Sequence, residues 1–588
     1  MMPEVGWANA LTDLWHQSRQ ICGKHLRPPI IVAMLLWITD ALIVGVALVV
    51  LAIALTGGAD LDAGGVTIRA HSVGNPIAAL LALLAIRYLA RFRRPFLGRE
   101  QWSLARIDQQ AIDLVGRVRS GLVRFGAEDT RVRRFLLWTM AAALLFKIGA
   151  AVIHPGFFSG DDVEIHEMTF ARLFDREWPI WDLRSAFYPM TFIYPAQRLL
   201  LFAGIDGPGA LVLAGRLVVA VISTLSIPLL FFAARRLYPA PVALIATCVF
   251  AVSFLHIGFG STELPRPVAT AFVLGGYACL LDARWSRAAL AGALFGIAAA
   301  LRFSEVVFLL PAVVHLAAER RIGRAAMAVG AAAATAAAIQ IVSDQLFWGT
   351  PLHSLRAFAD FTLVAGLSSR GYEPWHFYLS NPVAWTTVPV FVLAIAATSR
   401  ANWRVAIWFW LPLVVLSCLP HKEPRYLIPA SPFFALLAAI GLWRAIELVS
   451  APAAPGDRVR PAPAAALLAV ALLATLPLAA LQEVSRYDLG RSDADVRLAR
   501  EVVAGRPRGV AVEQLWRWGG RVYLRDVDVV HDVAPGSPAP ADDPGVTLVA
   551  LRRETCARLD CDAALAAAGF AERRTPAAAA SGYRVFGR

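Results

Sequence analysis

Apolar runs long enough to cross a lipid bilayer recur along most of this chain, and they constrain its fold more than any other feature. A window of about 19 residues finds roughly thirteen of them. They lie near 30–56, 75–91, 135–153, 209–232, 240–258, 266–282, 288–302, 304–319, 324–343, 384–399, 404–420, 426–446 and 464–483. Only 17% of the residues are charged, fewer than in soluble proteins. We therefore predict a mainly α-helical polytopic membrane protein with about 13 transmembrane helices.

Basic residues gather in the short loops between these runs and predict the orientation of the chain, because cytoplasmic loops are enriched in Lys and Arg. A cytoplasmic N-terminus places RYLARFRR, RRLYP, DARWSR, ERRIGR, SRANWR and GDRVR inside. The outer segments are then 57–74, 154–208, 259–265, 344–383, 421–425 and the tail after 484. The net charge of +13 is thus a topology signal, and we expect no nucleic-acid partner. The first apolar run is too long for a signal peptide, so we expect it to remain uncleaved.

We expect three parts. Residues 1–134 form an N-terminal extension with two transmembrane helices and a basic cytoplasmic segment, 92–134, that is either an amphipathic surface helix or a plain linker helix. Residues 135–483 form the main membrane domain, with outer loops 154–208 and 344–383. Residues 484–588 change character: GVAVEQL, RVYLRDVDVVHDV, GVTLVALRR and SGYRVFGR are typical of strands and CARLDCDAALAAAGF of a helix. We predict a small extracytoplasmic α/β domain.

The cysteines leave one question open. Cys556 and Cys561 are the only two in the last part, and an oxidising compartment would permit a disulfide. Five-residue spacing on one helix is poor geometry for that bond, so pairing is undecided. The six cysteines contain no CxxC pair, so we predict no thiolate metal site.

Acidic residues gather at the start of the outer loop 154–208. In HPGFFSGDDVEIHEMTFARLF, four acidic residues lie within seven consecutive positions: Asp161, Asp162, Glu164 and Glu167. If a helix begins here, Ser159 can be its N-cap with Asp162 at N3, forming a capping box. The acids would then only cap and solvate a surface helix. An outward carboxylate near the interface could instead act as a general base on a hydroxyl group, and Asp161 and Asp162 are the candidates.

Aromatic and basic residues follow in this loop and in the outer loop 344–383, within WPIWDLRSAFYP and RGYEPWHFYLSNP. Aromatic side chains often anchor helices at the membrane interface. Together with the acids they could also form a wall for a sugar or a lipid headgroup. The candidate substrate-binding residues are Glu164, Trp181, Arg184, Tyr372, Trp375 and His376.

The stretch HKEPRY, residues 421–426, places four charged or titratable groups between two apolar runs. Charge beside a bilayer is costly unless it has a function, and Lys and Arg held close together are natural partners of a phosphate. Arg302 lies at the outer end of another run, against the positive-inside trend. The alternative is that these cations snorkel to lipid headgroups. The candidate phosphate-binding residues are His421, Lys422, Arg425 and Arg302.

These stretches resemble glycosyltransferase family 22, the lipid-phosphate-mannose-dependent mannosyltransferases of the GT-C fold. The family signature HKE-x-RF-x-x-x-x-P is similar to this chain over His421, Lys422, Glu423, Arg425, Tyr426 and, with one position of slippage, Pro429. Its TWEW…RS…P stretch is similar to PIWDLRSAFYP. Its YGTHPWHWY stretch is similar to RGYEPWHFYLSNP, with Trp375 and His376 in register. Its HPDE motif is similar to SGDD, which places Asp161 on the catalytic Asp and Asp162 on the Glu.

The resemblance covers roughly residues 135–450 and implies the GT-C fold and an inverting glycosyl transfer. A polyprenyl-phosphate sugar, with mannose as the implied sugar, would bind its phosphate on Lys422, Arg425 and Arg302, and an acid of the first loop would deprotonate an acceptor hydroxyl. The acceptor would be a glycan, a glycolipid or a protein, and no metal or cofactor is required. The two extra N-terminal runs and the outer C-terminal domain look more like bacterial GT-C enzymes, which implies an inner-membrane protein with an outward-facing site.

Two other functions fit a protein of this kind. A flippase or transporter of lipid-linked sugars predicts polar residues deep inside several spans and internal repeats, whereas here the charges gather at the outer ends. A non-catalytic glycolipid-binding protein would have the same pocket with an idle acid. The sequence leaves open the sugar, the acceptor, the oligomeric state, the role of the C-terminal domain and the choice between Asp161 and Asp162.

Overall fold

The computed structural model describes residues 129–362, 371–449 and 491–588, with residues 39, 42–46, 59–63, 66–70 and 83. The chain divides into two compact units, Met1–Glu128 with Gly349–Pro351, and Asp129–Trp348 with Leu352–Arg588. In the first, β1 (Ala59–Ala63) pairs antiparallel with β2 (Val66–Ala70). The predicted spans 30–56, 75–91 and 464–483 and most of the basic segment 92–134 lie outside the described residues.

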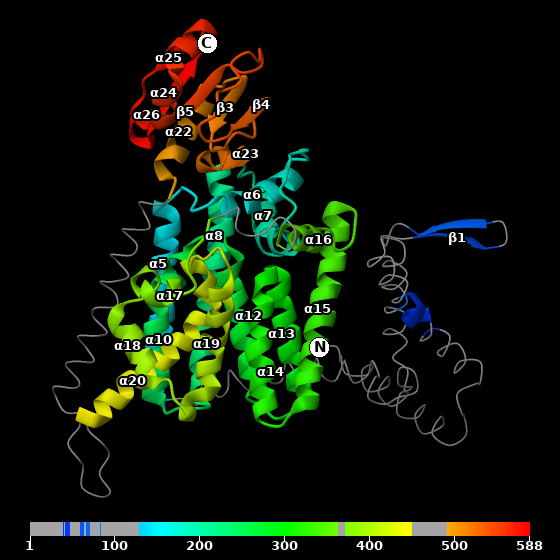
Figure 1. Ribbon diagram of the computed structural model, residues 1–588, viewed down its shortest axis with the longest axis vertical. Coiled ribbons are helices and arrows are strands. Elements are labelled where there is room, and N and C mark those ends of the chain that lie inside the picture. The colour runs from blue at the N-terminus through cyan, green and yellow to red at the C-terminus, as the bar shows by residue number, and fades with distance from the viewer. Residues whose placement is uncertain are drawn as a thin grey trace, which may run out of the picture. The chain divides into compact units, whose positions relative to one another are not determined.

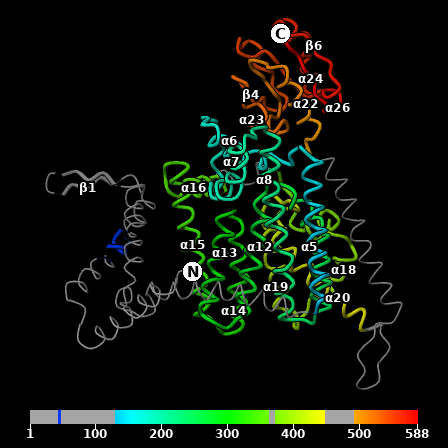
Figure 2. Tube along the Cα trace, turned by 180° about the vertical axis from the view of Figure 1, so that it is seen from behind, coloured from blue at the N-terminus to red at the C-terminus, as the bar shows by residue number. Residues whose placement is uncertain are grey.

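The second unit begins with a mostly helical part. Its α-helices are α5 (Thr130–Ile153), α6 (Gly160–Leu173), α7 (Tyr194–Phe202), α8 (Pro208–Thr224), α9 (Ser226–Arg235), α10 (Ala240–Ala251), α11 (Phe254–Ile257), α12 (Pro265–Leu280), α13 (Trp285–Leu301), α14 (Leu309–Ala318), α15 (Ile322–Trp348), α16 (His353–Asp360), α17 (Phe377–Ser380), α18 (Val388–Ala397), α19 (Trp403–Cys418) and α20 (Ser431–Val449). Shorter turns of helix include η3 (Pro189–Ile193), η4 (Phe259–Ser261), η5 (Phe303–Phe308) and η10 (Pro424–Ala430). In Figures 1 and 2, α5, α8, α12, α13 and α15 run alongside one another, and α6, α7 and α16 lie across one end of this bundle.

Five helical stretches are long and apolar enough to cross a membrane: Thr130–Ile153, Pro208–Arg235, Ile322–Trp348, Arg400–Cys418 and Pro424–Glu447. The bent pair Ala240–Ala251 and Phe254–Ser261 would make a sixth. Each predicted run between 135 and 446 is helical in the structure. Because several of these helices are long and apolar enough to cross a membrane, the chain is an integral membrane protein. The predicted number of about thirteen spans is not confirmed, because several of these helices are shorter than a full span and three predicted runs lie outside the described residues.

Close helix packing fixes the end of α13, which matters because Arg302 follows it directly. Gly292 faces α15 so closely that a Cβ atom there would lie 2.1 Å from the carbonyl oxygen of Ala328. Small residues allow membrane helices to approach in this way. The helix α13 therefore has little freedom to slide against α15, and the position of Arg302 is set by the bundle.

The C-terminal part is a small α/β domain around a five-stranded sheet of order β4-β3-β5-β7-β6. The strands are β3 (Gly509–Glu513), β4 (Val529–Val533), β5 (Leu548–Arg552), β6 (Ala571–Arg573) and β7 (Tyr583–Gly587). The helices are α22 (Asp493–Ala504), α23 (Gly520–Tyr523), α24 (Arg553–Leu559), α25 (Cys561–Ala567) and α26 (Pro576–Ser581). Strand β3 pairs parallel with β4 and β5, and β7 pairs antiparallel with β5 and β6.

Two local expectations for this domain are wrong. The stretch RVYLRDVDVVHDV is a strand only over its last five residues, because the chain first turns through helix α23. The predicted single helix 556–570 is two helices, since Asp560 adopts a left-handed backbone with φ of 47° and ends α24. This break brings Cys556 and Cys561 to a Cα–Cα separation of 4.9 Å, and the two form a disulfide. The doubt about their pairing rested on an unbroken helix.

Candidate functional site

The site begins at the first turn of α6. The helix starts where the acidic cluster predicts, with Ser159 as N-cap and Asp162 at N3, but the predicted capping box does not form. The Ser159 hydroxyl instead accepts a hydrogen bond from Arg425 Nη1 at 3.0 Å. The Asp162 carboxylate accepts one from the backbone N–H of Phe158 at 2.9 Å. The two side chains expected to cap the helix thus connect it to the rest of the site.

Three guanidinium groups surround the carboxylate of Asp161, and we call Arg184, Arg302 and Arg425 the arginine cluster. Arg184 forms an ion pair with Asp161, Arg425 Nη2 lies 3.2 Å from it and Arg302 Nη2 lies 3.8 Å from it. Arg184 also pairs with Glu164. The structure thus brings together five of the residues singled out in the sequence, from four separate segments of the chain.

Each arginine comes from a different part of the chain. Arg184 lies in the loop before η3, Arg302 is the C-cap of α13, and Arg425 lies in η10 just before α20. Arg425 is further held by Glu423, whose Oε1 accepts from its Nη2 at 3.0 Å. The guanidinium of Arg302 makes no hydrogen bond within the described residues, and its nearest carboxylate is Asp161. It is the member of the cluster best able to take an additional anion.

The cluster changes the acidity of Asp161. Burial alone would raise the pKa of this carboxyl group, but the charges of Arg184, Arg425 and Arg302 hold its pKa well below the usual range. Asp161 is therefore ionised at any physiological pH. Its side chain keeps 16% of its surface exposed, so water and a ligand can reach it.

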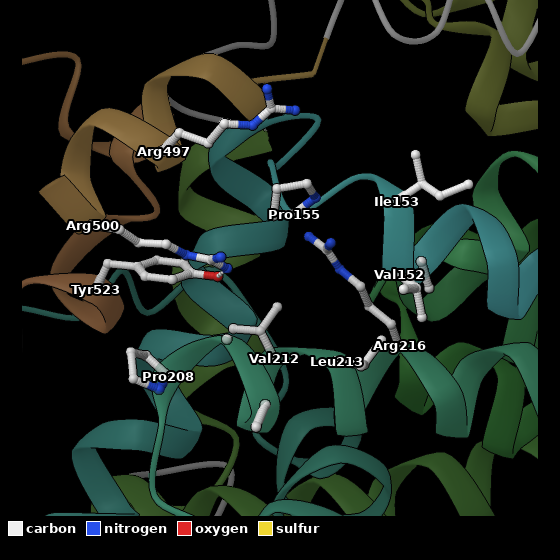
Figure 3. Close-up of a pocket in the computed structure, with 13 residues that line it drawn as sticks. Val152, Ile153, Pro155, Pro208, Val212, Leu213, Arg216, Arg497, Arg500 and Tyr523 are labelled. Carbon is white, nitrogen blue, oxygen red and sulfur yellow. Dashed lines mark hydrogen bonds between the residues drawn. The ribbon is translucent and has the colours of Figure 1, made fainter. Parts of the chain in front are cut away.

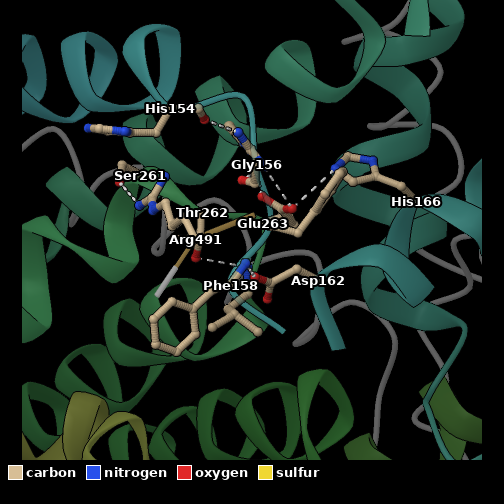
Figure 4. A network of polar contacts seen from close by, with 12 residues as sticks. His154, Gly156, Phe158, Asp162, His166, Ser261, Thr262, Glu263 and Arg491 are labelled. Atoms are coloured by element: carbon tan, nitrogen blue, oxygen red, sulfur yellow. Dashed lines mark hydrogen bonds and ion pairs between the residues drawn. The ribbon is translucent and has the colours of Figure 1, made fainter. Parts of the chain in front are cut away.

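Asp162 points into a second set of contacts, the buried network of Asp162, His166, Arg216 and Glu263, much of which is shown in Figure 4. Arg216 Nε donates to Glu263 at 2.7 Å, and both side chains are almost fully buried. His166 Nε2 lies 3.8 Å from the same carboxylate. Burial and the nearby Glu263 charge raise the pKa of Asp162 to about 7. Burial lowers the pKa of His166 to about 4, so its imidazole is neutral.

The C-terminal domain helps to hold the loop before α6. Asp493 bonds His154 Nδ1 at 2.8 Å and the backbone N–H of Gly156 at 2.6 Å. Ser492 accepts from the N–H of Phe157 at 3.0 Å. One hydrophobic core also includes Phe157 of the loop and Trp518 of the domain. The domain is therefore part of the scaffold of the site.

Across the described part of the chain, His421 and Lys422, also in HKEPRY, bond to other groups of the protein and not to Asp161. His421 Nε2 lies 3.0 Å from Glu423 Oε1. Lys422 is buried, and its ammonium group donates to the carbonyls of Glu373, at 2.7 Å, and Leu419. These contacts tie the outer loop 371–378 to this segment. The predicted contact of His421 and Lys422 with phosphate stays a prediction, whereas Arg425 already lies beside Asp161.

The aromatic candidates lie further out. Trp181 packs edge-on against Phe361 at 6.0 Å between ring centroids. Tyr372 is 77% exposed and Trp375 is 68% exposed, and His376 Nδ1 lies 3.1 Å from Ser380. In the part of the chain that the structure describes, no hydrogen bond or ion pair joins these four residues to Asp161. Their role in substrate binding stays a prediction.

Three charged residues of the site were not among the candidates from the sequence. Arg216 and Glu263 form the centre of the buried network. Arg266 pairs with Glu305 at 3.1 Å and stacks 4.3 Å from the ring centroid of Tyr426. Its Nη1 is buried and has no hydrogen-bond partner among the residues that the structure describes. A charged residue inside an apolar run is a signal for function or for a buried partner, and Arg216 and Arg266 both meet that criterion.

The sequence of this chain matches a family of known proteins. The model of the Alg9-like mannosyltransferase family matches residues 164–486. GPI mannosyltransferase 3 of Eremothecium gossypii is 32% identical over 126 residues, which is 19% of this chain and 21% of that protein. Mannosyltransferase APTG1 of Arabidopsis thaliana is 24% identical over 329 residues, 52% of this chain and 58% of that protein. The matches therefore span less than two thirds of these relatives.

Among solved structures, ArnT from Cupriavidus metallidurans in the apo state superposes with a TM-score of 0.52 at 16% identity, over 78% of this chain and 98% of that one. The same protein bound to undecaprenyl phosphate gives a TM-score of 0.50 at 15% identity, over 76% and 97%. This likeness is one of fold, and it bears out the predicted GT-C architecture. The family model covers more than half of the chain, and the chain belongs to the Alg9-like mannosyltransferase family.

Proposed function

We propose that this protein is an inverting glycosyltransferase that transfers a sugar, mannose in the simplest case, from polyprenyl phosphate to an acceptor hydroxyl on the outer face of the membrane. The observation that carries the proposal is the arginine cluster around the partly exposed carboxylate of Asp161. The departure of a phosphate needs nearby cations, and the deprotonation of an alcohol needs an accessible base. Membership of the family supports mannose as the sugar.

In the proposed reaction the acceptor oxygen bonds to the anomeric carbon as the bond from that carbon to the phosphate oxygen breaks. The electron pair leaves with polyprenyl phosphate, whose charge Arg302 and Arg425 stabilise. The acceptor proton passes to Asp161. A single displacement from the face opposite the phosphate inverts the anomeric centre.

The same cluster regulates the base. A carboxylate held by three guanidinium groups is a weak base, because its charge is already compensated. A donor phosphate would compete with Asp161 for Arg302 and Arg425. Each guanidinium that turns to the phosphate raises the basicity of Asp161, so we propose that the base becomes effective only when the donor is bound.

Asp162 serves a different role in this proposal. Its side chain is 1% exposed and accepts from the Phe158 N–H, so an acceptor hydroxyl cannot reach it as directly as Asp161. We assign Asp162 to positioning the first turn of α6, and Asp161 to accepting the proton. The acceptor itself, whether glycan, glycolipid or protein, and the bacterial plasma membrane as location stay predictions.

The test is transfer of label from radiolabelled polyprenyl-phosphate mannose to lipid and protein acceptors in membranes that contain the wild type or Asp161→Asn. Removal of a general base should lower transfer by a factor of about 10²–10⁴, while binding of the donor is retained. Asp175→Asn is the matched control, since Asp175 is an exposed acid just after α6.

Full activity of Asp161→Asn would overturn the assignment of the base. If the wild type transfers no label while it binds the lipid phosphate, the mannose assignment is wrong, and the same assay with other lipid-linked sugars identifies the donor. Failure to bind any polyprenyl phosphate would overturn the proposed function itself.

A further inference from the structure

A cavity of about 730 Å³ lies between α5, α8 and the C-terminal domain, and neither Asp161 nor the arginine cluster lines it. Its apolar wall includes Val152 and Ile153 of α5 and Val212 and Leu213 of α8. Both helices belong to candidate membrane spans. The side chains of Val152 and Ile153, at the end of α5, are 58% and 66% exposed. The apolar wall of the cavity therefore continues onto a surface suited to lipid.

Positively charged side chains also line the cavity. Of the thirteen residues that line the cavity, three are arginines, Arg216, Arg497 and Arg500, and none is acidic. Figure 3 shows their side chains around the same open space. Arg216 is neutralised by Glu263. Arg497 and Arg500 form no ion pair with any carboxylate in residues 129–362, 371–449 and 491–588, so the cavity has uncompensated positive charge.

Two further features favour an anion. Arg500 is held over the ring of Tyr523, 5.2 Å from the centroid, and donates to its hydroxyl at 3.1 Å, a neutral contact that leaves its charge free. The N-terminus of α8, a helix of 17 residues whose N-cap Gly207 has no capping side chain, also faces the cavity through Pro208 and Gly209. Pro208 has no amide hydrogen and the N–H of Ala210 donates to the Gly207 carbonyl, so the N–H of Gly209 and the helix dipole supply the attraction for negative charge here.

We propose that this cavity binds the phosphate headgroup of an anionic membrane lipid, with Arg497 and Arg500 as the phosphate ligands and the acyl chains along α5 and α8. A positive pocket that opens beside an exposed apolar helix end matches an amphiphile with a negative head, which a soluble anion or a neutral lipid would match only in part. The proposal goes beyond the glycosyl transfer described above and does not depend on it.

The site also has a structural connection to the loop before α6. Arg216 lines the cavity and donates to the carbonyl oxygens of His154, at 2.6 Å, and Gly156, at 2.8 Å. Pro155, between them, lines the cavity as well. A bound headgroup would therefore rest against the segment that leads into the first turn of α6.

Native mass spectrometry of the full-length protein, released from nanodiscs of phosphatidylcholine and phosphatidylglycerol in equal amounts, tests the proposal. The wild type should retain one more phosphatidylglycerol than the double variant Arg497→Ala and Arg500→Ala. Both side chains are exposed, so this variant should fold normally, and an unchanged unfolding temperature checks that. Arg508→Ala is the matched control, because Arg508 is an exposed arginine of the same domain that does not line the cavity.

A second variant changes the cavity without changing its charge. A Cβ atom on Gly209 would lie 2.8 Å from Arg500 Nη2, so Gly209→Val must push that side chain aside. Gly209→Val should also lose the extra phosphatidylglycerol. Equal retention by the wild type and the double arginine variant would overturn the proposal. Complete displacement of the lipid by inorganic phosphate would overturn the lipid assignment in favour of a free anion.

Discussion

The two sides of the first turn of α6 handle charge in different ways. In the buried network, Glu263 faces one guanidinium, that of Arg216, and both side chains are nearly inaccessible. In the arginine cluster, Asp161 faces three guanidinium groups and keeps part of its surface in contact with solvent. The carboxyl groups of Asp161 and Asp162 are neighbours in sequence, yet the pKa of the first is lowered and that of the second is raised.

This difference suggests that the buried network stabilises the fold and that the arginine cluster forms the functional site. A closed and fully buried ion pair holds a fold together because either partner alone would be an uncompensated charge. An accessible carboxylate with several guanidinium groups, one of them with unused donors, can exchange partners when an anion arrives. Variants of each set should therefore respond differently to the loss of one charge.

The largest expected effect is on stability. Glu263→Gln removes the only carboxylate within salt-bridge distance of Arg216 in the described residues and should lower the free energy of unfolding by about 3–5 kcal/mol. Asp161→Asn should lower it by less, because Arg184 and Arg425 keep Glu164 and Glu423 as partners. Thermal unfolding of the two variants in the same detergent measures both, and equal losses would contradict the comparison.

The next effect concerns pH. Burial raises the pKa of Glu167, on α6, from 4.5 to about 7. The folded state then binds more protons than the unfolded state between these values, so the free energy of unfolding should fall as pH rises from 4.5 to about 7. Between these two pKa values, the free energy of unfolding should change by about 1.4 kcal/mol for each pH unit. Glu167→Gln should flatten this part of the curve.

Asp161 should affect the free energy of unfolding in the opposite direction and at lower pH. Its pKa is lowered, so its stabilisation is complete above its ordinary value of 3.8 and is lost as pH falls below it. Asp161→Asn should therefore change stability under acid conditions. It should affect the slope between pH 4.5 and 7 only through Asp162, whose raised pKa depends mainly on burial and Glu263 and less on the charge of Asp161. A larger change of that slope in Asp161→Asn than in Glu167→Gln, or none in Glu167→Gln, would contradict the assignment.

A smaller effect is expected on donor binding. Arg425→Lys keeps the charge beside Asp161 but loses the planar fork that can hold two oxygens at once. The Kd for polyprenyl-phosphate sugar should rise about tenfold, which is about 1.4 kcal/mol. Arg284→Lys is the control, since Arg284 is 71% exposed at the start of α13 and away from the cluster. An unchanged Kd in Arg425→Lys would remove this arginine from the phosphate site.

The smallest effect tests a neutral contact of the buried network. The Tyr188 hydroxyl donates to the backbone carbonyl of Glu263 at 2.6 Å. Tyr188→Phe should lower the free energy of unfolding by about 1 kcal/mol, well below the effect of Glu263→Gln. Tyr372→Phe, at an exposed position, should have no measurable effect. A loss in Tyr188→Phe as large as that in Glu263→Gln would mean that the charge of Glu263 adds little.

Much of the site could be predicted because its parts carry local signals. Asp161 lies in a dense acidic run, Arg425 in a charged interruption between two spans, and Arg302 at the wrong end of a helix for a topology signal. The predicted topology places all three residues on one side of the membrane, where they can lie close together. The same reasoning found four of the five strands of the C-terminal sheet, where apolar residues cluster between turn signals.

The remaining part depended on contacts that no local pattern encodes. Arg216 and Glu263 are 47 residues apart, and each is a single charge within or beside an apolar stretch. The break of the helix at Asp560 depends on one left-handed residue, which Asp tolerates but does not require. Whether an aromatic residue such as Trp375 faces the substrate or the interface depends on side-chain placement, which composition does not determine.

The hydrogen bonds of Ser492 and Asp493 to the loop before α6 have a consequence for biosynthesis. Ser492 lies 335 positions after its partner Phe157. At about 5–20 residues per second, a ribosome needs roughly 20 to 70 s to cover that distance. The loop that leads to the proposed base is thus made early, well before Ser492 and Asp493, the two residues that hold it, are translated. A newly made chain should acquire activity only after its final domain has been translated and folded, so a stalled or prematurely terminated chain would be an inactive membrane protein and not a partly active enzyme.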